Sequence, residues 1–153
     1  MIKQAYFAYG INIIKQRVRN QCPGSKLRGK AVLEGYRFLI NSRGMATIAK
    51  NVSSTVYGLL WDITPEDERL LDWYEGVNDG HTVKKQVRIK TESNEDKSVI
   101  ALAYVSAVST PGRSREGYIS SITDALERYE FPKEYVLELK QWSELETETN
   151  RSD

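Results

Sequence analysis

The sequence predicts an α+β fold, a small mixed and mostly antiparallel β-barrel of about six strands flanked by helices. Two observations favour it. Helical patterns interrupt the strand-like segments at irregular intervals, so a regular βαβ order and an all-parallel sheet are not expected. The last two helical patterns follow the last strand and would lie against the outside of the barrel. Residues 1–142 contain no repeat or linker and form one predicted domain, followed by a polar C-terminal tail at 143–153.

The composition narrows the class of protein. With 153 residues, of which 40% are hydrophobic and 28% charged, the chain can form one domain with its own core and is typical of a globular protein. A net charge of +1 gives no support for nucleic-acid binding. Cys22 is the only cysteine, which excludes an internal disulfide. His81 is the only histidine, so the chain has few of the side chains that usually bind transition metals. No stretch resembles a transmembrane helix or a signal peptide, so we expect a cytoplasmic location and no membrane partner.

Four strands are expected in the first half of the chain. The first is largely apolar, as a strand covered on both faces would be, and leads through Tyr9-Gly10-Ile11-Asn12 into a short helix that ends at Cys22-Pro23-Gly24-Ser25. The alternation of the second strand is interrupted near Gly35, which predicts a β-bulge. Gly58 in the fourth strand predicts that another backbone or a ligand passes close by. The four strands span residues 2–8, 31–40, 45–49 and 55–63.

A helix start follows the fourth strand at Thr64-Pro65-Glu66-Asp67. Thr64 can cap the helix, proline suits its first position, and the two acids favour its positive end. We expect Leu70, Leu71 and Tyr74 to face the core and Gly76 to end the helix. The remaining elements are strands at 82–90 and 99–105, a polar hairpin connection at 91–97 between them, and helices at 114–129 and 132–142, the second with Trp142 in its buried stripe.

The junction between the first strand and the helix is the first candidate site. Gly10 lets the backbone turn sharply and lets a ligand approach the main chain. The amides that open a helix lack intrahelical partners and favour an anion, here a small carboxylate or phosphate. The sequence contains neither G-x-G-x-x-G nor a P-loop, so no dinucleotide or nucleotide is indicated. The alternative is an ordinary strand–turn–helix corner.

Glu75, in the last turn of the helix that begins at Thr64, is the second candidate. It lies four residues after Leu71 and therefore flanks the buried stripe. Partial burial and the negative end of the helix dipole both raise the pKa of a carboxyl group, toward the range useful for proton transfer. The alternative is an edge glutamate that bonds to nearby amides.

Three motifs together resemble the γ-glutamylcyclotransferase-like family. They are Tyr6-Phe7-Ala8-Tyr9-Gly10-x-Asn12, Val56-x-Gly58-x-x-Trp61 and Leu71-Asp72-x-x-Glu75-Gly76-Val77, and the resemblance runs from Ala5 to about Tyr118. It implies a small mixed β-barrel with helices and an activity that releases 5-oxoproline from γ-glutamyl compounds. By similarity Glu75 matches the catalytic acid/base, and the substrate-binding residues are Tyr6, Tyr9, Gly10, Ile11, Asn12 and Tyr118.

Two departures from the family pattern concern the pocket. Ile11 stands where the family commonly has serine, which removes a hydroxyl contact but leaves the backbone amide. His81-Thr82 follows Gly80 where the family often carries a tyrosine, so the leaving amine stays undefined. We expect His81 to be an exposed loop residue and Cys22 to fill a helix end, while Trp73 is either a surface aromatic or a lid over the pocket.

The expected reaction needs little from the protein. The α-amine of the substrate attacks its own γ-carbonyl, and such intramolecular attacks reach effective molarities of roughly 10⁵ M or more. One carboxylate can carry both proton transfers, so no metal, cofactor or covalent intermediate is required. The expected partner is a small γ-glutamyl substrate, and the oligomeric state stays open. Alternatives are a biosynthetic deglutamylase that unmasks a protected amine and a non-catalytic relative that binds a small anion.

Overall fold

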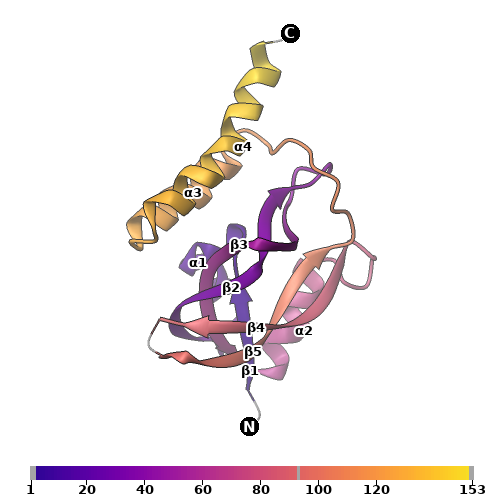
Figure 1. Ribbon diagram of the computed structural model, residues 1–153. Helices are drawn as coiled ribbons and strands as arrows, with labels where there is room; N and C mark the ends of the chain where they lie inside the picture. The colour runs from indigo at the N-terminus through magenta and orange to yellow at the C-terminus, as the bar shows by residue number, and fades with distance from the viewer. Residues whose placement is uncertain (1–2, 93, 152–153) are drawn as a thin grey trace.

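Five strands close into a barrel in the order β1-β3-β2-β4-β5, with helices around it (Figure 1). The computed structural model describes residues 3–92 and 94–151. The strands are β1 (Gln4–Ala8), β2 (Lys26–Ile40), β3 (Ala46–Ile63), β4 (Thr82–Thr91) and β5 (Asn94–Ser106). The helices are the 3₁₀ turn η1 (Ile11–Ile13), α1 (Lys15–Gln21), α2 (Pro65–Tyr74), α3 (Tyr118–Arg128) and α4 (Lys133–Arg151).

The barrel is mixed and mostly antiparallel, as predicted. β1 runs antiparallel to β3 and closes the barrel by a parallel bridge to β5, at Tyr6 and Leu102. The strand count is five rather than about six, because the two strands expected at 45–49 and 55–63 are the ends of β3. Of the polar residues between them, Lys50 pairs with Tyr36, and those at 51–54 lie in the bulge before pairing resumes at Thr55 and Glu34, so one strand continues across the interruption in the apolar pattern. Ile2, expected in the first strand, lies outside the described residues.

Two glycines behave as the sequence predicts. The pairing of β2 with β3 shifts register between Glu34 and Tyr36, and Gly35 between them has a φ of +83°. Gly58 is the point of closest approach between β3 and β1: a Cβ built on it would lie 2.4 Å from the carbonyl oxygen of Ala8 and 2.8 Å from the Phe7 ring. The close neighbour is therefore backbone, directly before the glycine turn that follows β1.

Substituting Gly58 by alanine should destabilise the protein by roughly 1–3 kcal/mol, because the added methyl group forces β1 and β3 apart in a packed core. Thermal unfolding with circular dichroism measures the loss. Val52→Ala on the same strand is the control, since Val52 is 95% exposed and its truncation should stay within about 0.5 kcal/mol. A Gly58→Ala protein as stable as the wild type would contradict the tight contact.

The core fills the barrel and continues under the helices. Its largest fully buried side chains come from every strand of the barrel, from η1 and from α2, namely Trp61, Phe7, Ile13, Leu33, Leu39, Ile40, Leu59, Leu60, Ile63, Leu71, Ile89 and Leu102. Cys22 is completely buried at the C-terminal end of α1, as expected, and burial raises the pKa of its thiol to about 12. This cysteine therefore packs as a small apolar residue.

α2 starts as predicted but packs differently. The Thr64 hydroxyl accepts from the Asp67 amide and the Asp67 carboxylate from the Thr64 amide, both at 3.1 Å, which is a complete capping box. Leu71 is fully buried, but the expectation that Leu70 and Tyr74 also face the core is wrong: they are 41% and 54% exposed. The buried residues of α2 are Asp67 and Leu71, four positions apart, which turns the Leu70–Tyr74 row outward.

α3 and α4 pack against each other as a pair beside the barrel (Figure 1). α3 starts at Tyr118 rather than Ser114, because Gly117 before it adopts a left-handed conformation with φ +82°. Its buried face is the predicted one, with Ile119, Ile122, Ala125 and Leu126. α4 continues to Arg151 through most of the segment predicted as a tail, and Trp142 on it is half-buried against the core. Along the described residues, none of the helices combines the length and apolar character of a membrane span.

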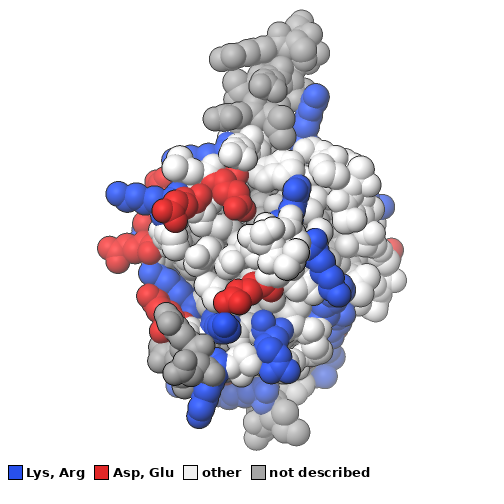
Figure 2. All heavy atoms as spheres, viewed as in Figure 1, with Lys and Arg blue, Asp and Glu red and all other residues white. Residues whose placement is uncertain are grey.

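Charge is mixed on the face that Figure 2 shows. Basic and acidic side chains are interspersed over the left and lower parts of this view, and uncharged surface covers most of its upper right. The formal net charge of the whole chain is +1.

Candidate active site

Two adjoining hollows meet at Glu75. The inner hollow, of about 60 Å³, lies between the glycine turn after β1 and the C-terminal end of α2, and the outer hollow, of about 380 Å³, opens beside it. Four residues line both, namely Met45, Ala46, Glu75 and Tyr104. The inner hollow contains all seven residues that the sequence singled out: Tyr6, Tyr9, Gly10, Ile11, Asn12, Glu75 and Tyr118. The structure thus brings together positions from β1, α2 and α3.

The glycine turn is tighter than expected. Gly10 is followed by the 3₁₀ turn η1 rather than directly by an α-helix, and the first hydrogen bond of that turn runs from the Ile13 amide to the Gly10 carbonyl at 2.9 Å. The amides of Ile11 and Asn12 precede this bond. A Cβ at Gly10 would lie 3.3 Å from that of Ala46, a tight contact between this turn and β3. Ile11 is half-buried and forms part of the wall.

Glu75 owes its position to the end of α2. Its amide donates to the Leu71 carbonyl at 2.8 Å, and Gly76, with φ +70°, ends the helix directly after it. Burial raises the pKa of the Glu75 carboxyl, and the guanidinium of Arg17 on α1 partly opposes the rise. Arg17 reaches the site through Asn12, whose side-chain oxygen accepts from Arg17 Nε at 3.4 Å. The carboxyl group therefore favours its protonated form more than an exposed glutamate does.

The tyrosines around Glu75 stay protonated. Burial, followed by the Glu75 charge, raises the pKa of Tyr6 and Tyr9, and burial raises that of Tyr118. The Tyr6 hydroxyl accepts from Asn12 Nδ2 at 3.0 Å, and the Tyr118 hydroxyl from the Ala46 amide at 3.2 Å. Because each accepts from a neighbour, each keeps its own proton for an acceptor in the hollow. Among the described residues that line the inner hollow, Glu75 thus has the side chain best suited to exchange protons with a ligand.

The comparisons with known proteins agree with this picture. The model of the AIG2-like family matches residues 55–139, more than half of the chain. The chain belongs to the AIG2-like family. This confirms the resemblance predicted from the three motifs.

This AIG2-like protein is also similar to two relatives and to one solved structure. It is 28% identical over 119 residues to the human gamma-glutamylcyclotransferase and 25% identical over 148 residues to the mouse protein of the same name. The first alignment covers 69% of the chain but only 63% of the human protein, and the second covers 88% and 76%. The structure of a gamma-glutamyl cyclotransferase matches 91% of the chain and 87% of its own length, with a TM-score of 0.81 and 24% identity, which confirms the fold.

Sequence reasoning missed Tyr104, which lines both hollows of this AIG2-like protein. Its ring meets that of Tyr6 edge-on, with centroids 5.8 Å apart, and its carbonyl accepts from the Tyr9 hydroxyl at 2.5 Å. Its own hydroxyl donates to Asp72 at 2.7 Å, and Lys84 pairs with Asp72 and Glu68 on α2. Tyr104 lies in a strand that was expected to be buried, and a buried tyrosine hydroxyl needs a polar partner. That requirement was the one signal in the sequence that pointed to Tyr104.

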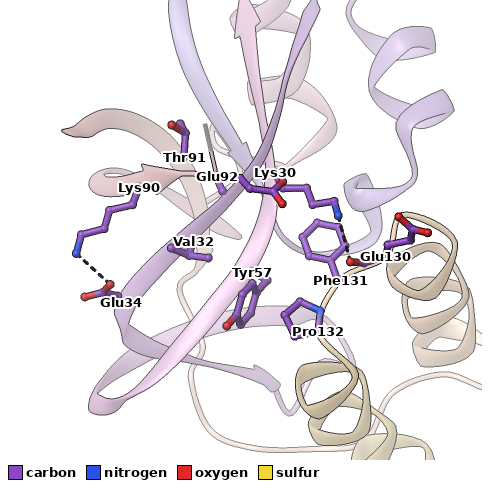
Figure 3. A pocket seen from close by; sticks show the side chains of 11 residues that line it. Lys30, Val32, Glu34, Tyr57, Lys90, Thr91, Glu92, Glu130, Phe131 and Pro132 are labelled. Carbon is purple, nitrogen blue, oxygen red and sulfur yellow. Dashed lines mark hydrogen bonds and ion pairs between the residues drawn. The ribbon is translucent and has the colours of Figure 1, made fainter. Parts of the chain in front are cut away.

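A larger hollow of this AIG2-like protein lies away from Glu75. It encloses about 710 Å³ between β2, β3, β4 and the turn before α4 (Figure 3). Lys90 pairs with Glu34 at 3.2 Å, and Lys30 donates to the Glu130 carbonyl at 3.1 Å. Both lysines are engaged by the protein, and this hollow shares no residue with the Glu75 site. In residues 3–92 and 94–151, no group of three or more His, Cys, Asp or Glu side chains is arranged to hold a metal ion.

Proposed function

We propose that this protein is a γ-glutamyl cyclotransferase that releases 5-oxoproline and a free amine, with Glu75 as its general acid/base. The observation that carries the proposal is the partly buried Glu75 carboxyl, with its raised pKa, in the same hollow as the glycine turn and three protonated tyrosines. The names of the human and mouse relatives support it. A carboxyl that can accept and return a proton suits a reaction that moves protons from one nitrogen to another.

The reaction proceeds by ring closure within the substrate. The glutamyl end enters the inner hollow, and Glu75 takes a proton from the α-ammonium group. The freed α-amine attacks the γ-carbonyl carbon, forming a new carbon–nitrogen bond and a tetrahedral oxyanion. The bond to the leaving nitrogen then breaks while Glu75 returns the proton to that nitrogen. The ring nitrogen gives up its second proton through Glu75 to the departing amine, which leaves as an ammonium ion, so atoms and charge balance. Holding the glutamyl chain in a folded form supplies much of the acceleration.

The hydroxyl groups of Tyr6 and Tyr118 are suited to the developing oxyanion. Each accepts a hydrogen bond from Asn12 or from the Ala46 amide, so its own O–H is available to donate. Tyr9 differs, because its proton is used on the Tyr104 carbonyl. Its role is to hold β1 against β5. The backbone amides at Ile11 and Asn12 are suited to the α-carboxylate of the glutamyl group, a contact that survives the replacement of serine by Ile11.

The direct test is to incubate the purified protein with a panel of γ-glutamyl amino acids and γ-glutamyl amines and to quantify 5-oxoproline. The proposal expects turnover of part of the panel. Binding without any 5-oxoproline would contradict it and favour a non-catalytic relative that retains the anion site.

Removing the Arg17 cation should move the pH dependence of the reaction. Arg17 lowers the pKa of Glu75, so Arg17→Met raises it further. Glu75 must be ionised to accept the first proton, and the acidic limb of the kcat/KM profile should therefore shift to higher pH. Arg19→Met is the matched control on the same helix, because Arg19 lies over the Trp61 ring and should leave the limb in place. A limb that moves equally in both variants, or in neither, would contradict the assignment.

A further inference from the structure

The outer hollow is lined by a cationic side chain and by aromatic side chains. Of the described residues that line it, Arg43 is the cationic one, and it comes from the turn between β2 and β3. Trp73 and Tyr74 line the same hollow from the end of α2. The outer hollow shares Glu75 with the inner one, so in the proposed reaction the leaving group would lie beside it.

Arg43 and His81 form a pair that presents hydrogen-bond donors. Arg43 Nη1 lies 2.5 Å from His81 Nδ1, and because a guanidinium can only donate, Nδ1 accepts and His81 carries its proton on Nε2. Both members are held by the backbone around them. The Arg43 amide donates to the fully buried Asn41 side chain at 3.0 Å, and the His81 amide donates to the Gly76 carbonyl at 3.1 Å. The remaining N–H groups of the pair suit a carboxylate.

Trp73 and Tyr74 provide an apolar surface beside this pair. Their rings meet edge-on with centroids 5.0 Å apart, and the residues are 73% and 54% exposed. Two large aromatic side chains left open to solvent next to a hollow are unusual for a helix that has a buried face, and they suit contact with a ligand. Trp73 is therefore a surface aromatic that lines the site, one of the two predictions made for it.

We propose that the leaving group is an α-amino acid with a large apolar side chain. Its carboxylate binds Arg43 and His81, and its side chain packs against Trp73 and Tyr74. This inference rests on the proposed cyclotransferase function. Asp79 also lines the outer hollow and bears the opposite charge, so a conjugate of a cationic amine is the competing outcome.

Three matched substrates separate the two contacts. γ-Glutamyl-phenylalanine has both groups, γ-glutamyl-phenethylamine lacks the carboxylate, and γ-glutamyl-alanine lacks the ring. We expect kcat/KM for the first to exceed that for the second by roughly 10- to 100-fold, as for a charge-assisted hydrogen bond. It should exceed that for the third by roughly tenfold or more, from lost apolar contact. Equal values for the first two, or faster turnover of a γ-glutamyl diamine, would overturn the inference while leaving the cyclotransferase assignment intact.

Variants tie the preference to the named residues. Arg43→Met should lower kcat/KM for γ-glutamyl-phenylalanine roughly tenfold, mainly through KM, and leave γ-glutamyl-phenethylamine nearly unchanged. The control is Arg88→Met, because Arg88 is exposed on β4, bonds to Ser98 and lines neither hollow. An equal loss on both substrates would show that Arg43 does not read the carboxylate. Absence of 5-oxoproline from every substrate would instead refute the proposed function.

Discussion

Glu75→Gln is expected to abolish release of 5-oxoproline, lowering kcat by at least about 10²–10⁴-fold. Glutamine keeps the shape of the side chain and its packing at the end of α2, but it cannot accept a proton from the α-ammonium group or return one to the leaving nitrogen. The remaining hydroxyls cannot take over, because burial raises the pKa of Tyr6, Tyr9 and Tyr118 and keeps them protonated. Quantified 5-oxoproline under substrate saturation measures the loss.

Glu66→Gln is the matched control for this variant. Glu66 lies on the same helix, is exposed and lines neither hollow, so its substitution should leave kcat unchanged. If Glu75→Gln retained a normal rate, or if Glu66→Gln lost as much activity, Glu75 would not be the acid/base of the reaction.

Unfolding gives a second readout for the same substitution. A carboxyl group whose pKa is raised by folding contributes stability below its unfolded pKa, and that contribution is lost as the pH rises through the folded pKa. Glu75 is such a group. The melting temperature of Glu75→Gln relative to the wild type should therefore rise between mildly acidic and neutral pH, which also shows that the inactive variant is folded.

Local signals in the sequence account for much of the fold. The cap at Thr64, the bulge at Gly35 and the close approach at Gly58 each depend on a few neighbouring residues, and the structure has all three. The single long strand β3 could not be predicted in this way. Its polar middle, with Val52 95% exposed, has no strand pattern of its own and lies in the bulge between two stretches that pair with β2. That pairing on both sides joins the two stretches into one strand, and a local pattern does not contain it.

Most of the inner hollow was predictable because its residues stand in two compact motifs, one around Gly10 and one around Glu75. The outer hollow was not. Arg43 lies in a turn of ordinary composition, and its contact with His81 joins residues 38 positions apart. Tyr74 was placed in the core because it follows Leu71 at a helical spacing, but Asp67 and its capping contacts rotate α2 by making the Asp67–Leu71 row the buried one. The direction of a helix face depends on such tertiary contacts, which spacing alone does not contain.

Asn41→Ala should destabilise the protein by roughly 2–4 kcal/mol and weaken the outer hollow at the same time. The Asn41 side chain is completely buried and makes four hydrogen bonds: it donates to Ser106 Oγ and to the Val108 carbonyl, at 2.8 and 2.9 Å, and accepts from two amides at 3.0 Å. Those amides belong to Arg43 and Met45, which line the outer hollow. Alanine leaves all four groups without this partner inside the protein. At roughly 2–4 °C per kcal/mol, the melting temperature should fall by about 5–15 °C.

The functional consequence follows from which residues Asn41 holds. Asn41 holds the turn that carries Arg43, so loosening this turn should displace Arg43 more than Glu75. At temperatures where Asn41→Ala is folded, KM for γ-glutamyl-phenylalanine should therefore rise. The kcat for γ-glutamyl-phenethylamine should change little. Asn51→Ala is the control, because Asn51 makes an equivalent local turn contact with the Ser53 amide at 3.1 Å on an exposed part of β3. Its stability should change by less than about 1 kcal/mol. A loss of kcat on both substrates would mean that the turn supports Glu75 as well, and the two hollows would then have to be treated as one cooperative unit.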